Sequence, residues 1–186
     1  MEYTKDDLMR EVNVTDKYVA FWGSAFSNFF PCKLHIDISE IIGGEPREIE
    51  FSSSEQYFMW QKATYFNDDE TAEKILKAET PQAAKALGRK VKGFDEDMWR
   101  AWRYDAMLNA LTSKFIDNPE LMDLLLAPEF EGKHFVEGSQ IDKIWGVGLD
   151  WRDPRIEDEE NWVGLNLLGM ALDEVRESFL FEEEEV

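Results

Sequence analysis

The sequence predicts an α+β fold, a predominantly helical single domain with a small antiparallel β hairpin or sheet near its N-terminus. Alternating apolar residues at 34–38 and 48–51 flank a glycine-containing turn, which is typical of a hairpin. After residue 52 the apolar residues recur at steps of three and four, which is typical of amphipathic helices. With 186 residues, of which 44% are hydrophobic, the chain can bury one core without disulfides.

The predicted strands come first along the chain. Leu34, Ile36 and Ile38 share one face of a strand, so His35 between them is expected to face water. The alternating residues 48–51 follow a longer loop and complete the hairpin. The apolar run at 18–22 predicts a third strand.

The predicted helices follow, and most of them begin at a capping signal. Ser52 and Glu55 match the Ser-x-x-Glu capping box, so a helix is expected to begin there. Capping or apolar-stripe signals predict four further helices, at 81–88, from Asp95 past residue 111, at 119–126 and at 165–179.

Net charge limits the classes of partner. The chain carries a net charge of −20, and residues 157–186 contribute −10 of it from eleven acidic residues and one basic residue. This charge opposes general binding to nucleic-acid backbones, whereas residues 60–120, at −1, allow a local anion site. We expect an N-terminal extension at 1–17, one domain at 18–180 and an acidic tail at 181–186.

The sequence predicts a cytoplasmic protein with no membrane partner. Cys32 is the single cysteine, so no internal disulfide can form, and the N-terminus lacks the pattern of a signal peptide. No apolar run approaches the ~18 residues of a transmembrane helix. No metal or cofactor is expected, because two histidines and one cysteine make a poor metal set and no P-loop or Rossmann glycine pattern is present.

Glu55 and Lys62 form the first candidate site. They lie seven residues apart, so on a helix they share a face and are separated by about 10 Å along the axis. Phe58 and Met59 lie between them and supply an apolar floor. This arrangement suits a polar ligand that carries a ring, but Glu55 can also be a simple capping residue.

Two glycine-containing loops are further candidates for ligand binding. In the first, aromatic and amide side chains can stack a planar ring and hydrogen-bond its edge, or they can form an ordinary core; these are Phe26, Asn28 and Phe29. In the second, glycines bring the backbone close to a ligand, or they simply form a tight turn; its candidates are Asp142, Trp145, Gly146 and Gly148.

Arg89 and Arg103 are the basic residues that we favour for phosphate binding. An arginine side chain can bind phosphate through two parallel hydrogen bonds. Arg89 follows Gly88 at a predicted helix end, and Arg103 lies one turn after Trp99 on the same helix face. The neighbouring lysines are expected to be solvated helix surface.

Taken in order, these motifs resemble those of the YbiA/NADAR (NAD- and ADP-ribose-associated) family. The resemblance covers roughly residues 20–180 and leaves the N-terminal residues and the acidic runs as additions. The matching segments are Phe26-Ser-Asn-Phe-Phe, Ser54-Glu-Gln-Tyr-Phe with Gln61-Lys62, Ala86-Leu-Gly-Arg89, Trp99, Ala110-Leu-x-x-Lys114-Phe115, Asp142-x-x-Trp145-Gly-x-Gly148 and Asn166-x-Leu-Gly169.

The resemblance implies an N-glycosidase, an enzyme that cuts the bond between a ribose carbon and an amino-bearing heterocycle. It also implies functional roles at Glu55, Trp99, Asp142 and Lys62. Glu55 or Asp142 would act as the base while the other stabilises the sugar cation, and Trp99 would stack the heterocycle. Lys62 would hold phosphate together with Arg89, or would trap a ring-opened sugar as a Schiff base.

Several substrates and function classes stay open at this point. The resemblance implies a phosphorylated ribosylamino-pyrimidine of the riboflavin pathway, or ADP-ribose attached to guanine in modified nucleic acid. The acidic composition favours the small molecule. The alternatives from other classes are a non-catalytic ADP-ribose or nucleotide binding module and an acidic protein that engages a basic partner.

Overall fold

The computed structural model describes residues 3–184, with side chains for residues 3–39 and 41–181. It contains two compact units, a terminal unit built from residues 1–27 and 119–186 and a central unit built from residues 28–118. Both units combine helices with short strands, so the predicted α+β class is confirmed. The predicted acidic tail at 181–186 lies mostly outside the described side chains, and residues 185–186 lie outside the described chain.

The terminal unit is built on a mixed sheet of three strands. β1 (Val12–Val14) pairs antiparallel with β2 (Tyr18–Phe21), and β2 pairs parallel with β5 (His134–Glu137). The prediction of a strand near residue 18 is therefore confirmed, but this strand joins β1 and β5 rather than the hairpin. β1 falls inside the predicted N-terminal extension and adds a strand to this sheet.

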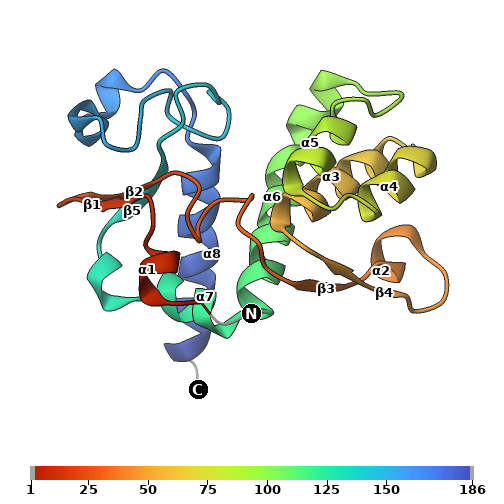
Figure 1. Ribbon diagram of the computed structural model, residues 1–186, viewed down its shortest axis with the longest axis horizontal. Helices are drawn as coiled ribbons and strands as arrows, with labels where there is room; N and C mark the ends of the chain where they lie inside the picture. The colour runs from red at the N-terminus through yellow and green to blue at the C-terminus, as the bar shows by residue number, and fades with distance from the viewer. Residues whose placement is uncertain (1–2, 185–186) are drawn as a thin grey trace. The chain divides into compact units, whose positions relative to one another are not determined.

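Helix α8 (Leu167–Glu184) packs against β5 of the same unit, as Figure 1 shows. Leu168, Leu172 and Val175 are buried, as their spacing predicts. Leu165 is 58% exposed because it precedes the first turn of the helix, so its predicted place in the apolar stripe is wrong. The other short elements of this unit are α1 (Lys5–Leu8), α7 (Pro119–Leu125), η1 (Pro128–Phe130), η2 (Pro154–Glu157) and η3 (Glu159–Asn161).

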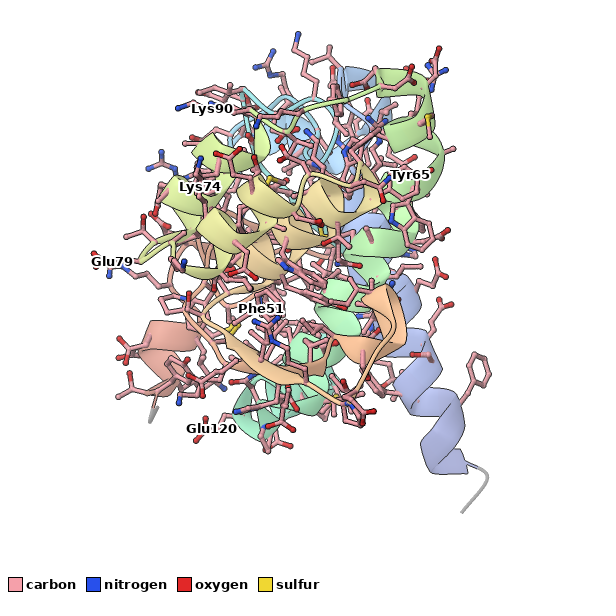
Figure 2. The ribbon with its side chains drawn as sticks, turned by 90° about the vertical axis from the view of Figure 1, so that its right-hand side faces the viewer. Phe51, Tyr65, Lys74, Glu79, Lys90 and Glu120 are labelled. Carbon is pink, nitrogen blue, oxygen red and sulfur yellow. The ribbon has the colours of Figure 1, made fainter. Side chains whose placement is uncertain are left out.

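The central unit begins with the predicted hairpin of β3 (Leu34–Asp37) and β4 (Glu48–Phe51), which pair antiparallel. The loop between these strands contains a short helix, α2 (Ser39–Ile42), which the sequence patterns do not predict. Phe51 at the end of β4 contacts the rings of Tyr57 and Trp60 at 4.9 and 5.7 Å between centroids. Figure 2 shows Phe51 between the hairpin and the helices, where it ties the two layers together.

Four helices complete the central unit, namely α3 (Ser54–Tyr65), α4 (Asp69–Leu76), α5 (Pro81–Gly88) and α6 (Glu96–Ile116). Helix α3 packs against each of the other three, as Figure 1 shows. The predicted starts of α5 and α6 are confirmed, because the side chain of Thr80 accepts from the N–H of Ala83 and that of Asp95 accepts from the N–H of Met98.

The predicted capping box at Ser52 and Glu55 is wrong by one residue. The capping side chain is that of Ser53, which accepts a hydrogen bond from the N–H of Gln56 at 3.2 Å. The side chain of Gln56 reaches back and accepts from the N–H of Ser52 at 2.8 Å. Because Ser53 and Gln56 carry these capping bonds, the helix start does not account for Glu55.

Candidate active site

Helices α3 and α6 bring three of the predicted site residues into one part of the central unit. Lys62 and Glu55 are on α3, and Trp99 is on α6. The Nζ atom of Lys62 lies 5.7 Å from the centre of the Trp99 ring and 4.0 Å from the centre of the Phe94 ring. Phe58, one helical turn before Lys62, packs its ring 5.3 Å from Trp99. The lysine amine therefore lies above the rings of Phe94 and Trp99, whereas the spacing of α3 predicts a floor made of Phe58 and Met59.

The surroundings of Lys62 change its acid–base chemistry. Burial lowers the pKa of the Lys62 amine, because a half-buried ammonium loses hydration, while the carboxylates of Glu96 and Glu55 act in the opposite direction and raise this pKa. The effect of burial is the largest of these, so the pKa of Lys62 is lowered overall. A larger fraction of this amine is neutral at a given pH than for a lysine in water, and a neutral amine is a nucleophile.

Glu55 is buried at the start of α3, where a network centred on Asn28 fixes the backbone. Glu55 is only 3% exposed. The N–H of Glu55 donates to the carbonyl of Asn28 at 3.0 Å, and the side-chain amide of Asn28 contacts the sulfur of Met107 at 3.1 Å. A carboxylate in the first turn of a helix also gains from the helix dipole. Asn28 thus positions Glu55, and its predicted contact with a ligand stays a prediction.

The two predicted arginines have different surroundings. Arg103 is buried on α6, and its guanidinium lies 3.5 Å from the carboxylate of Glu96, the same residue that acts on Lys62. Arg89 is exposed at the C-cap of α5. Phe29 is half-buried, with the amine of Lys85 5.0 Å from its ring centre. Arg103 therefore belongs with the Lys62 cluster, whereas Arg89 is a surface residue.

The loop that follows β5 holds four predicted site residues of the terminal unit, Asp142, Trp145, Gly146 and Gly148. One oxygen of Asp142, Oδ1, accepts hydrogen bonds from the N–H groups of Ile144 and Trp145 at 3.0 and 2.9 Å. A Cβ on Gly146 would lie 2.8 Å from the carbonyl oxygen of Glu137, and Gly148 has a φ of +80°. Close packing and backbone conformation therefore explain both glycines. The half-buried Asp142 is held firmly, and its role in chemistry stays a prediction.

Phe26 belongs to the aromatic core of the terminal unit. Its ring is fully buried and lies 5.7, 5.8 and 4.7 Å from the rings of Phe21, Phe130 and Phe135. Such clusters stabilise a fold through area and ring geometry. The structure thus shows a packing role for Phe26, while its predicted contact with a ligand is untested.

Phe94 and Glu96 are site residues that the sequence analysis missed. Both lie next to the cap of α6, and both act on Lys62. A sequence signal for Phe94 was available, because an apolar residue before the cap commonly packs against the fourth residue of the helix, which is Trp99 here. Glu96 had no such signal.

Among the described side chains, no group of three or more His, Cys, Asp or Glu is placed to hold a metal ion. No helix in the described part of the chain is long and apolar enough to cross a membrane.

Comparisons with known proteins give the family of this chain. It is 40% identical to the Caenorhabditis elegans protein irg-1, over 91% of this chain and 83% of that protein. It is 37% identical to N-glycosidase R617 of Acanthamoeba polyphaga mimivirus, over 88% of this chain and 96% of the relative. The solution structure of Escherichia coli YbiA superposes with a TM-score of 0.70 at 26% identity, and covers 97% of this chain and 95% of that one. A model of the NADAR domain matches residues 20–180, so the chain belongs to the NADAR family.

Proposed function

We propose that the protein is an N-glycosidase that hydrolyses the bond between C1′ of a phosphorylated ribose and the amino nitrogen of a heterocycle. The observation that carries this proposal is the cluster of Glu55, Lys62 and Trp99, in which a buried carboxylate and an amine of lowered pKa accompany an aromatic wall. Relatives named N-glycosidases, R617 and YbiA, support it. The net charge of −20 favours a small-molecule substrate, such as a ribosylamino-pyrimidine phosphate, over modified nucleic acid.

The proposed reaction replaces one bond at C1′ by another. The C1′–N bond breaks, water supplies the oxygen that bonds to C1′, and the departing nitrogen takes up a proton. Positive charge develops on the ribose as the bond lengthens, and a fixed carboxylate such as that of Glu55 stabilises it. In the proposal a carboxylate takes a proton from the attacking water, and Trp99 stacks on the heterocycle.

Lys62 has two possible roles, and each leaves a different chemical trace. As an ammonium it would pair with the substrate phosphate. As a neutral amine it would bond to C1′ of the ring-opened ribose while the heterocyclic amine leaves, and water would then hydrolyse the resulting imine to release the sugar. The lowered pKa of Lys62 supports the second role. Borohydride reduces an imine to a stable amine, so a sugar-sized mass increase on Lys62 would identify it.

The decisive experiment offers two substrates to the purified protein. These are a ribosylamino-pyrimidine 5′-phosphate and DNA that carries ADP-ribosylated guanine, and the readout is chromatographic release of ribose phosphate or ADP-ribose. Release from the first substrate is expected, and release from the second alone would favour the alternative, an ADP-ribosyl-guanine hydrolase. Binding of ADP-ribose with no release from either substrate would identify a binding module and contradict the proposal.

A conservative substitution tests the role of Glu55. Glu55→Gln keeps the size of the side chain and removes its charge, so kcat should fall about 10²- to 10³-fold, the usual effect of losing one stabilising group in a transition state. Glu79→Gln is the matched control, because Glu79 is exposed and Figure 2 shows it at the edge of the helical layer. Equal kcat for the two variants would contradict a catalytic role for Glu55.

A further inference from the structure

The terminal unit contains a hollow that the proposed chemistry does not use. Its volume is about 740 Å³. Helix α8 supplies one wall, and residues 126–134, which lead from α7 into β5, supply the other; Figure 1 shows α8 beside α7. The lining side chains that decide its chemistry are Leu126, Pro128, Glu131, His134, Glu177 and Leu180.

Part of the lining is apolar and accessible to solvent. Leu126 is half-buried and Pro128 is exposed. Leu180 on α8 is 44% exposed, and the next residue along the helix, Phe181, is 67% exposed. Exposed apolar residues that gather in one place commonly mark a contact with another molecule. The hollow therefore offers apolar area that a partner would cover.

The basic side chains of the hollow are already bonded to the protein itself. The Nζ amine of Lys133 donates to the carbonyls of Thr15 and Asp16 at 2.7 and 3.0 Å. The guanidinium of Arg176 donates to the carbonyls of Phe130 and Lys133 at 3.1 and 2.7 Å. Arg176 is also only 9% exposed. Both cations therefore hold the chain around the hollow in place, and they do not make it an anion site.

The polar groups that remain in the hollow are hydrogen-bond acceptors. Glu131 and Glu177 are exposed, and neither carboxylate forms an ion pair with a described side chain. Nδ1 of His134 lies 2.9 Å from Oδ2 of Asp173, whose other oxygen accepts from the guanidinium of Arg176 at 3.1 Å. This pairing leaves Nε2 as the imidazole nitrogen that can meet a ligand. Acceptors and negative charge match ammonium and guanidinium groups, because those groups are donors only.

We propose that this hollow docks a segment of a partner protein in which lysine or arginine side chains lie beside apolar ones. The apolar side chains cover Leu126, Pro128 and Leu180, and the cations pair with Glu131 and Glu177. A protein segment fits better than a small amine, because one ion pair between exposed groups is weak, whereas a segment adds several pairs to a covered apolar area. A second copy of this chain is a poor occupant, since it also carries a net charge of −20 and like charges repel. The proposed hydrolysis uses none of these residues.

The test measures binding of two fluorescein-labelled peptides to the full chain by fluorescence anisotropy. One peptide carries leucines along one helical face with lysines beside them, and the other has the same composition in scrambled order. The ordered peptide should bind at least about tenfold more tightly, because only it covers the apolar lining while it pairs with the carboxylates. Leu180→Ser should weaken its binding about 3- to 10-fold, since less apolar area is then covered. Glu131→Gln and Glu177→Gln should each weaken it about 2- to 5-fold, the usual contribution of an exposed ion pair.

Leu165→Ser and Glu160→Gln are the matched controls in the same unit. Leu165 is 58% exposed, Glu160 is exposed, and neither lines the hollow, so both variants should keep the wild-type affinity for the ordered peptide. Because every substituted side chain is exposed, all variants should keep the wild-type circular dichroism spectrum.

Three results overturn the proposal. Failure of the ordered peptide to bind excludes the docking site. Equal affinity for the two peptides, or equal losses in the site and control variants, identifies general attraction to an acidic protein. Spermidine that binds as tightly as the ordered peptide, and loses this affinity in Glu177→Gln, identifies a site for a small amine.

Discussion

Lys114 is a fully buried lysine on α6, and its burial makes a quantitative prediction about stability. Its amine lies 5.8 and 5.5 Å from the ring centres of Phe30 and Phe115. Loss of hydration lowers the pKa of this amine from 10.5 to about 8, and a charge on the neighbouring Cys32 sulfur acts in the opposite direction. An ammonium in such a site destabilises the folded state relative to the unfolded state, where the amine is in water.

The size and sign of the effect follow from the two pKa values. Below pH 8 both the folded and the unfolded state hold the proton, so the folded state carries the full cost of burying the ammonium. The pKa falls from 10.5 to about 8, and each pKa unit corresponds to about 1.4 kcal/mol, so this cost is about 3 kcal/mol. Between pH 8 and 10.5 the folded state releases the proton while the unfolded state keeps it. The penalty therefore decreases as pH rises through this window, and stability from this group increases.

The variant Lys114→Met removes the titrating amine and keeps an unbranched side chain. Urea unfolding of wild type and variant at pH 7 and pH 9.5 gives the difference in their free energies of unfolding. That difference should shift by about 2 kcal/mol in favour of the wild type at the higher pH. Lys77→Met, at an exposed lysine of the same unit, controls for general loss of a positive charge. A wild-type-to-Lys114→Met difference that is the same at both pH values would refute the reasoning.

Three further outcomes are expected. Gln56→Leu removes a buried carboxamide that hydrogen-bonds the start of α3 and the end of α4. The free energy of unfolding in urea titrations should therefore fall by about 1–3 kcal/mol. An unchanged midpoint of urea unfolding would contradict this role. Gly169→Ala places a Cβ against the carbonyl oxygen of Phe135 and should lower the melting temperature well beyond Gly132→Ala, whose Cβ meets no described atom within 4 Å and adds only the strain of a φ of +69°; equal shifts would count against the clash. If Lys62 reacts as a neutral amine, kcat/KM should rise with pH and level off below pH 10.5, because the pKa of Lys62 is lowered. Lys62→Arg should then lose both the rise of kcat/KM with pH and the borohydride adduct. A kcat/KM that does not change with pH, together with no borohydride adduct in the wild type, would favour the phosphate-binding role.

Local signals predicted much of the fold, because caps and hairpins depend on residues close together in the chain. Thr80 and Asp95 begin their helices as expected, since a capping side chain only needs the backbone N–H groups a few residues ahead. The capping box at Ser52 was wrong by one residue because three consecutive serines offer equivalent hydroxyls, and only the packed structure selects Ser53. Strand β5 was missed because its partner β2 lies far earlier in the chain.

The candidate site likewise contains residues that the sequence predicted and neighbours that only the structure reveals. Glu55, Lys62 and Trp99 were predicted from helical spacing and from a family resemblance, and the structure brings Lys62 and Trp99 together. Phe94 and Glu96 were missed as neighbours of Lys62, because they come from the start of a different helix. The hollow beside α8 was also missed, since its walls come from segments that are far apart in the sequence.

By itself, the sequence determined the family and the α+β class, and it predicted Glu55, Lys62 and Trp99 as site residues, because these depend on residue type and short-range spacing. Only the tertiary structure lowers the pKa of the Lys62 amine. The pKa of Lys62 is lowered because packing against α6 and the segment before it removes water from the ammonium, and this loss of hydration exceeds the attraction of Glu96 and Glu55. Hydration is a property of the packed surroundings, so no pattern within α3 could specify it.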